Sequence, residues 1–195
     1  MPDGRLLIAS GNPGKLREYG ELLAGSGLEL LPCEPGVAED GDSYAANAAL
    51  KAEAVAARTG LPALGDDSGL EVEALHGFPG LHSARLADRQ EERQRLLFER
   101  LAGRPRPWLA RFVCVLALAL PGQPTRFFRG ERRGEVVEPR SRGWGFGYDP
   151  VFQVPEAGKT FAEMEPAEKH RWSHRAAAVL ELLEQGGLRG LSTGR

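Results

Sequence analysis

Apolar residues recur along the chain with two spacings, one typical of strands and the other typical of amphipathic helices. The run FVCVLALAL at residues 112–120 predicts a buried strand over residues 110–120, and RLLIAS predicts a first strand over residues 5–10. Further strands are predicted over residues 28–32 and within residues 126–137. Helical spacing predicts helices over residues 15–25, 43–59, 89–103 and 173–187.

Capping residues support two of these helices. Ser43 and Ser173 stand where an N-cap is needed, and Gly60 stands where a helix can end in the left-handed conformation. Residues 61–77 predict two strands joined by an acidic turn. Because strands and helices do not alternate strictly, the expected class is α/β with a mixed sheet flanked by helices, rather than a Rossmann fold or a barrel.

Composition and charge narrow the class of protein. A chain of 195 residues with 42% hydrophobic residues can form one domain, 1–195, or one domain with an appended second lobe. Its net charge of −2 gives no basic field that would recruit nucleic acid. The longest apolar run has nine residues, too few to cross a membrane as a helix. Cys33 and Cys114 form no CxxC pair, which indicates a reduced, cytoplasmic protein.

The segment SGNPGK, residues 10–15, places Lys15 at the start of a predicted helix. The positive end of the helix dipole disfavours a cation there. Either Lys15 is a solvated charge in an ordinary turn, or an anion lies beside it. The glycines would let backbone N–H groups approach a phosphate. The spacing does not fit a Walker A loop, which requires GxxxxGK followed by Ser or Thr.

The segment GDDSGL contains two adjacent aspartates, Asp66 and Asp67. In an extended chain their side chains point to opposite faces. We therefore expect one carboxylate to face a site and the other to be solvated or to cap a turn. A carboxylate at a strand end is a suitable ligand for Mg²⁺. The alternative is a solvated turn without function.

Two later segments carry groups suited to a nucleotide. In GWGFGYDPVF, glycines alternate with aromatic residues, so the backbone could pass close to a ligand while a ring stacks on a base. Taken by itself, however, the pattern favours a tight turn with core aromatics. In EKHRWSHR, His174 and Arg175 fall in the first turn of a predicted helix, with Lys169 just upstream. Cations at two helix starts suggest a polyanion. No HExxH pattern or third ligand supports zinc.

Seven segments stand in the order found in one known family: SGNPGK, ANAALKA, DDSGLEV, PGLHSAR, GFGYDPVF, GKTFAEM and EKHRWSHR. Over residues 6–183 the sequence resembles the inosine triphosphate pyrophosphatase family. The resemblance implies an elongated, two-lobed α/β fold with a central mixed sheet, a site in the cleft between the lobes, and a homodimer. It implies hydrolysis of non-standard purine nucleoside triphosphates (ITP, dITP, XTP) to the monophosphate and pyrophosphate with Mg²⁺.

The resemblance also assigns roles to individual residues. It implies that Asp67 is the catalytic carboxylate and a metal ligand. Relatives usually carry a Glu–Glu pair before the glycine and a Glu in the ANA segment; here Ala38-Glu39-Asp40 precedes Gly41, and Ala46 precedes Asn47. We assign Glu39 as the second metal ligand. The substrate-binding residues that the resemblance implies are Ser10, Gly11, Asn12, Pro13, Gly14, Lys15, Ser68, Phe146, Gly147, Tyr148, Asp149, Lys169, His174 and Arg175.

Three other functions stay open at the level of the sequence. They are a Maf-like pyrophosphatase acting on other nucleotides, a nucleotide-binding regulator without catalysis, and a P-loop phosphotransferase. The intact DDSG segment and the two cationic helix starts argue against the regulator, and the missing Walker spacing disfavours the phosphotransferase. The implied specificity has a physical basis, because donors such as Lys169 or Arg175 would pair with the 6-keto group of a purine and face the amino group of ATP unpaired.

Overall fold

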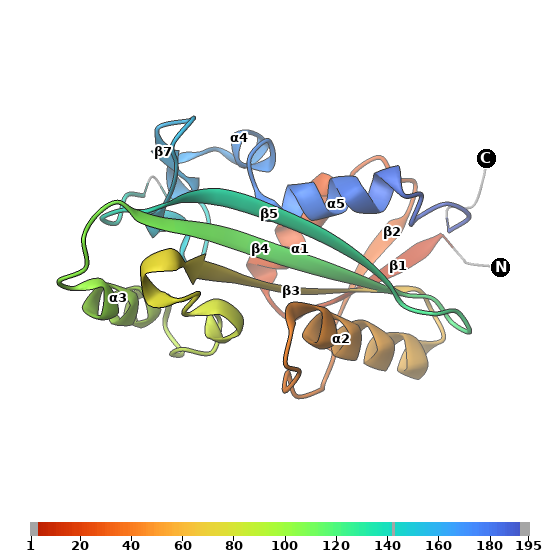
Figure 1. Cartoon of the computed structure of the whole chain (residues 1–195). Helices are drawn as coiled ribbons and strands as arrows, with labels where there is room; N and C mark the ends of the chain where they lie inside the picture. Colours follow the sequence, from red (N-terminus) through yellow and green to blue (C-terminus); the bar gives the residue numbers. More distant parts are fainter. Residues whose placement is uncertain (1–3, 142, 192–195) are drawn as a thin grey trace. The chain divides into compact units, whose positions relative to one another are not determined.

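The computed structural model describes residues 4–141 and 143–191 (Figure 1). Arg142, directly before the glycine–aromatic segment, and the two ends of the expected domain 1–195 lie outside the described residues. The strands are β1 (Arg5–Ala9), β2 (Glu29–Cys33), β3 (Ala63–Val72), β4 (Trp108–Ala119), β5 (Arg126–Val136), β6 (Phe152–Val154) and β7 (Lys159–Thr160). The α-helices are α1 (Pro13–Leu22), α2 (Tyr44–Thr59), α3 (Gln90–Leu101), α4 (Pro166–His170) and α5 (His174–Glu184), and short 3-10 turns cover Glu73–Leu75, Gly80–His82, Asp149–Val151 and Phe161–Glu163.

The strands form one mixed sheet in the order β2-β1-β3-β4-β5-β6-β7. β1 is parallel to β2 and to β3, whereas β6 is antiparallel to β5 and to β7. The predicted class, α/β with a mixed sheet flanked by helices, is confirmed. No helix of the described ranges is long and apolar enough to cross a membrane.

The chain divides into two compact units. Unit 1 comprises the residues up to Asp67, Cys114–Gly130 and the residues from Ala177 on; unit 2 comprises Ser68–Val113 and Glu131–Ala176. Three strands, β3, β4 and β5, contribute residues to both units. Asp67 and Ser68 are consecutive residues of β3, yet the first belongs to unit 1 and the second to unit 2.

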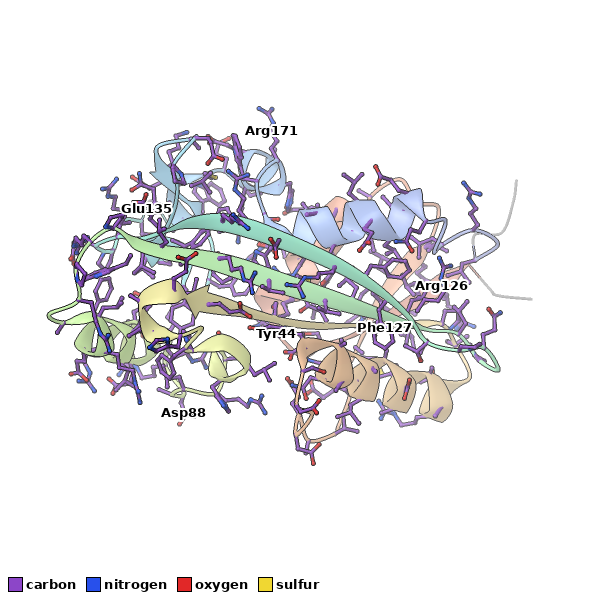
Figure 2. All side chains as sticks on the ribbon, viewed as in Figure 1. Tyr44, Asp88, Arg126, Phe127, Glu135 and Arg171 are labelled. Atoms are coloured by element: carbon purple, nitrogen blue, oxygen red, sulfur yellow. The ribbon has the colours of Figure 1, made fainter. Side chains whose placement is uncertain are left out.

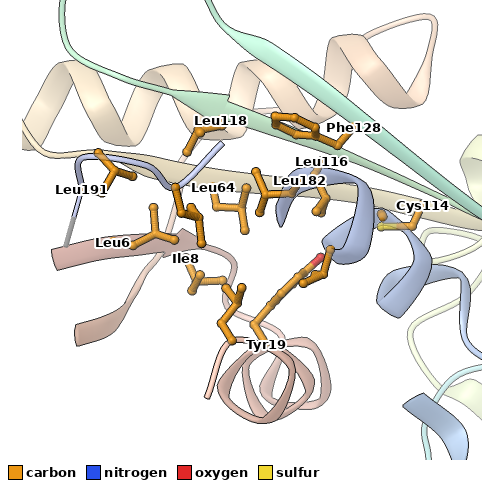
Figure 3. Packing of buried hydrophobic residues seen from close by; sticks show 14 residues of the cluster. Leu6, Ile8, Tyr19, Leu64, Cys114, Leu116, Leu118, Phe128, Leu182 and Leu191 are labelled. Atoms are coloured by element: carbon orange, nitrogen blue, oxygen red, sulfur yellow. The ribbon is translucent and has the colours of Figure 1, made fainter. Parts of the chain in front are cut away.

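In unit 1, the alternation of side chains along β1 builds a core on each face of the sheet. Leu6 and Ile8 pack with residues of α1 and α5, among them Tyr19 and Leu182 (Figure 3). Leu7 and Ala9 point the other way and pack against the alanine-rich face of α2. Helices α1 and α5 therefore cover one face, and α2 covers the other.

In unit 2, a single cluster combines the ends of β3, β4 and β5 with α3 and the segment after β5. It contains Leu97 and Leu101 from α3, and it surrounds three rings in mutual contact. Phe112 meets Phe152 edge-on at 4.7 Å between ring centroids and stacks on Phe161 at 5.9 Å. Such pairs add about 0.5–1.5 kcal/mol beyond the area that they bury.

The structure corrects one sequence prediction and adds a helix. Residues 61–77 do not form two strands around an acidic turn, because GDDSGL lies inside the continuous ten-residue strand β3. The short helix α4 was not predicted; Pro166 stands at its start, and it carries Lys169. The helices predicted over 15–25, 43–59, 89–103 and 173–187 are confirmed as α1, α2, α3 and α5, with boundaries shifted by up to three residues.

Gly65 sets how closely α2 approaches β3. A Cβ at this position would lie 2.2 Å from the carbonyl oxygen of Ala48 and 3.0 Å from the backbone nitrogen of Ala52. Both are backbone atoms, which cannot rotate away as the end of a flexible side chain can. The close approach brings the face of α2 that carries Asn47 and Lys51 onto the strand that carries Asp67.

We therefore predict that Gly65→Ala lowers the free energy of unfolding by about 1–3 kcal/mol, as overpacking of a tight core does. Urea denaturation would measure the change. The matched control is Gly20→Ala in α1, where a Cβ meets nothing within 4 Å. There alanine should stabilise the helix by up to about 1 kcal/mol. Similar effects at the two glycines would contradict this account of Gly65.

Candidate functional site

Unit 1 holds the predicted phosphate-binding segment, from the end of β1 into α1. Asn12 is the N-cap of α1, and its Oδ1 accepts hydrogen bonds from the N–H groups of Gly14 (2.9 Å) and Lys15 (3.1 Å). Ser10 Oγ accepts a bond from the N–H of Asn12 at 3.1 Å, and Pro13 occupies the first turn. Since Asn12 already caps two of the N–H groups, an anion at this helix start would have to replace its oxygen or bind its NH₂ group.

Lys15 lies beside a buried carboxylate. Its Nζ is 2.8 Å from Asp66 Oδ1, and the hydroxyl of Tyr19 donates to Asp66 Oδ2 at 2.5 Å. Asp66 and Tyr19 are both buried. The sequence argument expected an anionic ligand to compensate a cation at a helix start. The protein itself supplies a counter-charge, 51 residues away along the chain.

Asp67 points to the other face of β3, towards α2. Its Oδ2 accepts a hydrogen bond from Asn47 Nδ2 at 3.0 Å, and its Oδ1 is 3.6 Å from Lys51 Nζ. The same ammonium lies 3.1 Å from Glu39 Oε2. Asn47 and Lys51 are one helical turn apart, so they share the face of α2 that meets the strand. Glu39 and Asp67, the two predicted metal ligands, thus converge on one cation of the protein.

Burial is the dominant influence on the Asp67 carboxyl. Burial raises the pKa of this carboxyl above its usual value; Lys51 and Lys15 lower it by their charge, the Asn47 hydrogen bond lowers it as well, and Asp66 raises it. The effect of burial exceeds the lowering by the two lysines and by Asn47. A carboxylate with a raised pKa is a stronger base, which suits it to accept a proton from water.

The two aspartates point to opposite faces, as predicted, but neither is solvated. Asp66 is 3% exposed and Asp67 is 7% exposed. The prediction that one of them would be solvated or would cap a turn is wrong, because β3 is covered by a helix on each face in unit 1. Each carboxylate instead lies beside a lysine from a helix that covers its face of the strand.

Unit 2 brings together the predicted base-binding residues around Phe146. The carboxylate of Asp149 accepts from the ammonium of Lys169 at 2.6 Å and from the N–H of Phe146 at 2.8 Å, both through Oδ2. Asp149 and Lys169 are buried. Lys169 Nζ lies 5.0 Å and Arg175 Cζ lies 5.7 Å from the centre of the Phe146 ring, distances at which cation–π attraction operates.

Arg175 and His174 belong to the first turn of α5. Ser173 Oγ accepts from the N–H of Ala176 at 3.0 Å, so its predicted capping role is confirmed. Arg175 is 2% exposed, and its Nη2 donates to Ser68 Oγ at 3.1 Å. The His174 ring stacks on Phe112 at 4.5 Å. In contrast, Arg171 of the same segment points into solvent (Figure 2).

Gly147 and Tyr148 are held by their own contacts. The N–H of Gly147 donates to Gln90 Oε1 at 3.0 Å, and its carbonyl accepts from Gln94 Nε2 at 2.6 Å. The Tyr148 hydroxyl donates to the carbonyl of Ser83 at 3.2 Å, and burial raises the pKa of Tyr148 to about 12. Both residues therefore shape the turn, and Phe146 presents the ring.

Sequence reasoning missed several residues of these two clusters. In unit 1 they are Tyr19, Asn47, Lys51 and Asp66; in unit 2 they are Gln90 and Gln94. One signal was available: Asn47 and Lys51 stand four apart as polar residues in a buried, alanine-rich helix, a pattern that predicts a polar partner. The partners of Asp66 and Gly147 lie more than 40 residues away in sequence, and no local pattern indicates them.

A groove of about 640 Å³ in unit 2 contains none of the predicted site residues. It is lined by Glu71, Val72, Glu73, His76, Gly77, Leu109, Ala110, Arg111, Arg133 and Gly134. Arg111 Nε donates to Glu71 there at 2.7 Å. Among the described residues, no three His, Cys, Asp or Glu side chains cluster closely enough to bind a metal ion by themselves.

Comparison with known sequences places the chain in a family. The pattern of the Ham1 family matches residues 6–185. The chain belongs to the Ham1 family. Among its relatives, a dITP/XTP pyrophosphatase of Thermus thermophilus is 50% identical over 190 residues, which cover 92% of this chain and 90% of that protein. The dITP/XTP pyrophosphatase of Geobacillus kaustophilus is 47% identical over 190 residues, covering 92% and 93%.

Solved structures of Ham1 proteins share the fold. The HAM1 protein from Coxiella burnetii matches with a TM-score of 0.83 and 37% identity, over 94% of this chain and 98% of that one. The Ham1 protein of Staphylococcus aureus matches with a TM-score of 0.81 and 34% identity, over 94% and 99%. The resemblance that the seven motifs predicted is therefore confirmed.

The raised pKa of Asp67 predicts a pH-dependent effect of Asp67→Asn on stability. Above the ordinary pKa of 3.8 the native state binds more protons than the unfolded state, so wild-type stability falls as pH rises through the raised value. The Asp67→Asn variant has no carboxyl to ionise at this position, so it does not lose stability in this way. It should be more stable than wild type at pH 7, by about 1.4 kcal/mol for each unit of the shift, and the advantage should disappear as pH falls below 3.8.

Urea denaturation at a series of pH values would test this expectation. The control is Asp88→Asn, because Asp88 is exposed (Figure 2). The Asp88→Asn substitution should change the free energy of unfolding by no more than about 0.5 kcal/mol. An Asp67→Asn variant that is less stable than wild type at pH 7 would show that Lys51 and Lys15 outweigh burial.

Proposed function

We propose that this protein hydrolyses non-standard purine nucleoside triphosphates (ITP, dITP and XTP) to the nucleoside monophosphate and pyrophosphate. The observation that carries the proposal is Asp67, a buried carboxyl with a raised pKa that lies within the fields of two lysines, Lys15 and Lys51. The names of the relatives, dITP/XTP pyrophosphatases, support the reaction and the class of substrate.

In this proposal unit 1 supplies the groups for the triphosphate. Lys15 and the residues before it (Ser10, Gly11, Asn12, Pro13 and Gly14) would bind phosphate oxygens, and the positive charge of Lys15 would stabilise the charge that develops on the departing pyrophosphate. Asp67 would accept a proton from the water that attacks the α-phosphorus. Its raised pKa supports this role, because the proton-accepting group of a hydrolase works best when its pKa approaches the working pH.

Unit 2 would supply the groups for the base and the sugar. The half-buried ring of Phe146 offers a stacking surface, and Lys169, held by Asp149, offers N–H donors to a 6-keto group. Arg175, with Ser68 and His174, stands at the same cluster. Against ATP these donors would meet an amino group and stay unpaired, a penalty of about 1–3 kcal/mol for each buried group.

We infer that Glu39 and Asp67 bind Mg²⁺. Both carboxylates face one point, now held by the ammonium of Lys51 at 3.1 Å and 3.6 Å. Oxygen ligands of this kind suit Mg²⁺, which needs only one or two carboxylates and completes its shell with water and phosphate oxygens. When bound, the ion would neutralise phosphate charge. The residues present therefore fit the cofactor that the family resemblance implies.

We further propose that the protein is a cytoplasmic homodimer that requires neither nucleic acid nor a membrane. Cys33 and Cys114 form no disulfide, which supports a reducing compartment. In unit 2, the exposed Leu109 and the groove around Arg111 and Glu71 offer apolar area and charges of both signs, which a second copy of the chain can match.

Product analysis tests the reaction. With ITP and Mg²⁺, we expect the wild-type protein to release IMP and pyrophosphate, and to hydrolyse ITP and XTP faster than ATP or GTP. Asp67→Asn should lower kcat by at least about 100-fold, while isothermal titration shows that nucleotide binding persists. Inosine diphosphate and phosphate as products, or an unchanged rate for the variant, would reject this mechanism.

Metal removal tests the cofactor. Chelation with EDTA should abolish hydrolysis, and Mg²⁺ should restore it. Glu39→Gln should raise the Mg²⁺ concentration for half-maximal rate by about tenfold, as loss of one group that supports a metal does. Asp40→Asn is the control, because Asp40 is the exposed neighbour in the same run. Equal metal requirements for the two variants would remove Glu39 from the site.

A further inference from the structure

Two glutamines of α3 bind both polar backbone groups of Gly147. Gln90 accepts from the Gly147 N–H at 3.0 Å, and Gln94 donates to the Gly147 carbonyl at 2.6 Å. Because the N–H can only donate and the carbonyl can only accept, the backbone fixes which end of each amide faces it. Gln90 and Gln94 are four residues apart, so both reach the turn from the same face of α3.

Gly147 is a residue whose backbone needs such support. Its φ is +62°, in the left-handed region, and a Cβ there would meet nothing within 4 Å. Glycine is therefore required by the backbone conformation and not by crowding. The turn around it is closed by the N–H of Asp149, which donates to the carbonyl of Phe146 at 3.1 Å. The two glutamine bonds hold the middle of this turn.

The turn determines where the ring of Phe146 lies. Phe146 precedes Gly147, and its ring is the one that Lys169 and Arg175 approach at 5.0 Å and 5.7 Å. If the peptide group between Phe146 and Gly147 rotated, the Phe146 ring would move, and so would the hydrogen bond from the Phe146 N–H to Asp149. The position of the stacking surface thus depends on a helix more than 50 residues earlier in the chain.

The sequence of α3 also sets these two positions apart. The helix begins QEERQR, in which all residues except the two glutamines are charged, and both glutamines are half-buried. A carboxylate could serve at position 90, where an acceptor is needed, but not at position 94, where a donor is needed. Position 90 therefore requires an acceptor and position 94 requires a donor, although both lie on one face of α3.

We propose that Gln90 and Gln94 are positioning residues for the base-binding turn, and that Gln94 in particular sets the affinity for the purine. This inference rests on the proposed role of Phe146 in binding the base. Neither glutamine touches the substrate in this account; both act through the Gly147 backbone and the orientation of the Phe146 ring.

The test is the same substitution at both positions. Gln94→Glu places a carboxylate against the Gly147 carbonyl, so KM for ITP should rise by about tenfold, whereas kcat should change less than about threefold because Asp67 is untouched. Gln90→Glu adds the same charge one turn away but keeps the acceptor, so its KM should lie at least about fivefold below that of Gln94→Glu. Thermal melts would verify that both variants are folded at the assay temperature.

Two further variants separate the possible failures. If Gln94→Glu does not fold, Gln94→Met, which removes the donor without adding charge, should raise KM several-fold. Equal KM values for the position-90 and position-94 variants would overturn the inference. Phe146→Ala tests the role on which it rests: a raised KM for Phe146→Ala with normal KM for Gln94→Glu rejects the glutamines alone, and an unchanged KM for Phe146→Ala rejects the base-binding turn itself.

Discussion

Two adjacent carboxylates inside one covered strand impose the main constraint on unit 1. Strand geometry sends Asp66 and Asp67 to opposite faces, and both faces are buried. A buried carboxylate is costly unless charges and hydrogen bonds compensate it. One lysine on each covering helix supplies a compensating charge: Lys15 from α1 and Lys51 from α2. The close packing of α2 on Gly65 brings the second lysine within reach.

Asp66 and Asp67 are compensated to different degrees, which suits the two carboxylates to different roles. Asp66 has a contact below 3 Å to an ammonium and another to a phenol, which fix both of its oxygens. The ammonium nearest to Asp67 stands farther off, at 3.6 Å, and is shared with Glu39. Incomplete compensation leaves Asp67 with a raised pKa. The raised pKa lowers the free energy of unfolding at neutral pH. The loss comes from the one group proposed to take up a proton, as expected where the needs of a reactive site oppose those of stability.

Local patterns predicted what depends on local interactions. The capping serines, the amphipathic helices and the buried strand β4 were readable because each is decided within a few residues. The acidic turn was a wrong prediction for a physical reason: Asp-Asp-Ser-Gly has turn composition, and only burial by two helices makes it a strand interior. The motifs identified the segments around Asp67, Phe146 and Arg175. The counter-charges and glutamine contacts that position them come from distant segments, which no local spacing reveals.

The cluster around Phe146 in unit 2 shows how a glycine-rich sequence can present a fixed aromatic surface. Residues 143–147 contain three glycines, all with positive φ, so this stretch has little conformational preference of its own. Its order has to be imposed from outside, and three contacts do so: Gln90 and Gln94 at Gly147, and the bond from Tyr148 to Ser83. The glycines let the backbone turn tightly, and α3 with its preceding loop selects one conformation. In the proposed function, discrimination among purines that differ by one exocyclic group requires that selection, since a binding group acts well only when its neighbours hold it close to its productive position.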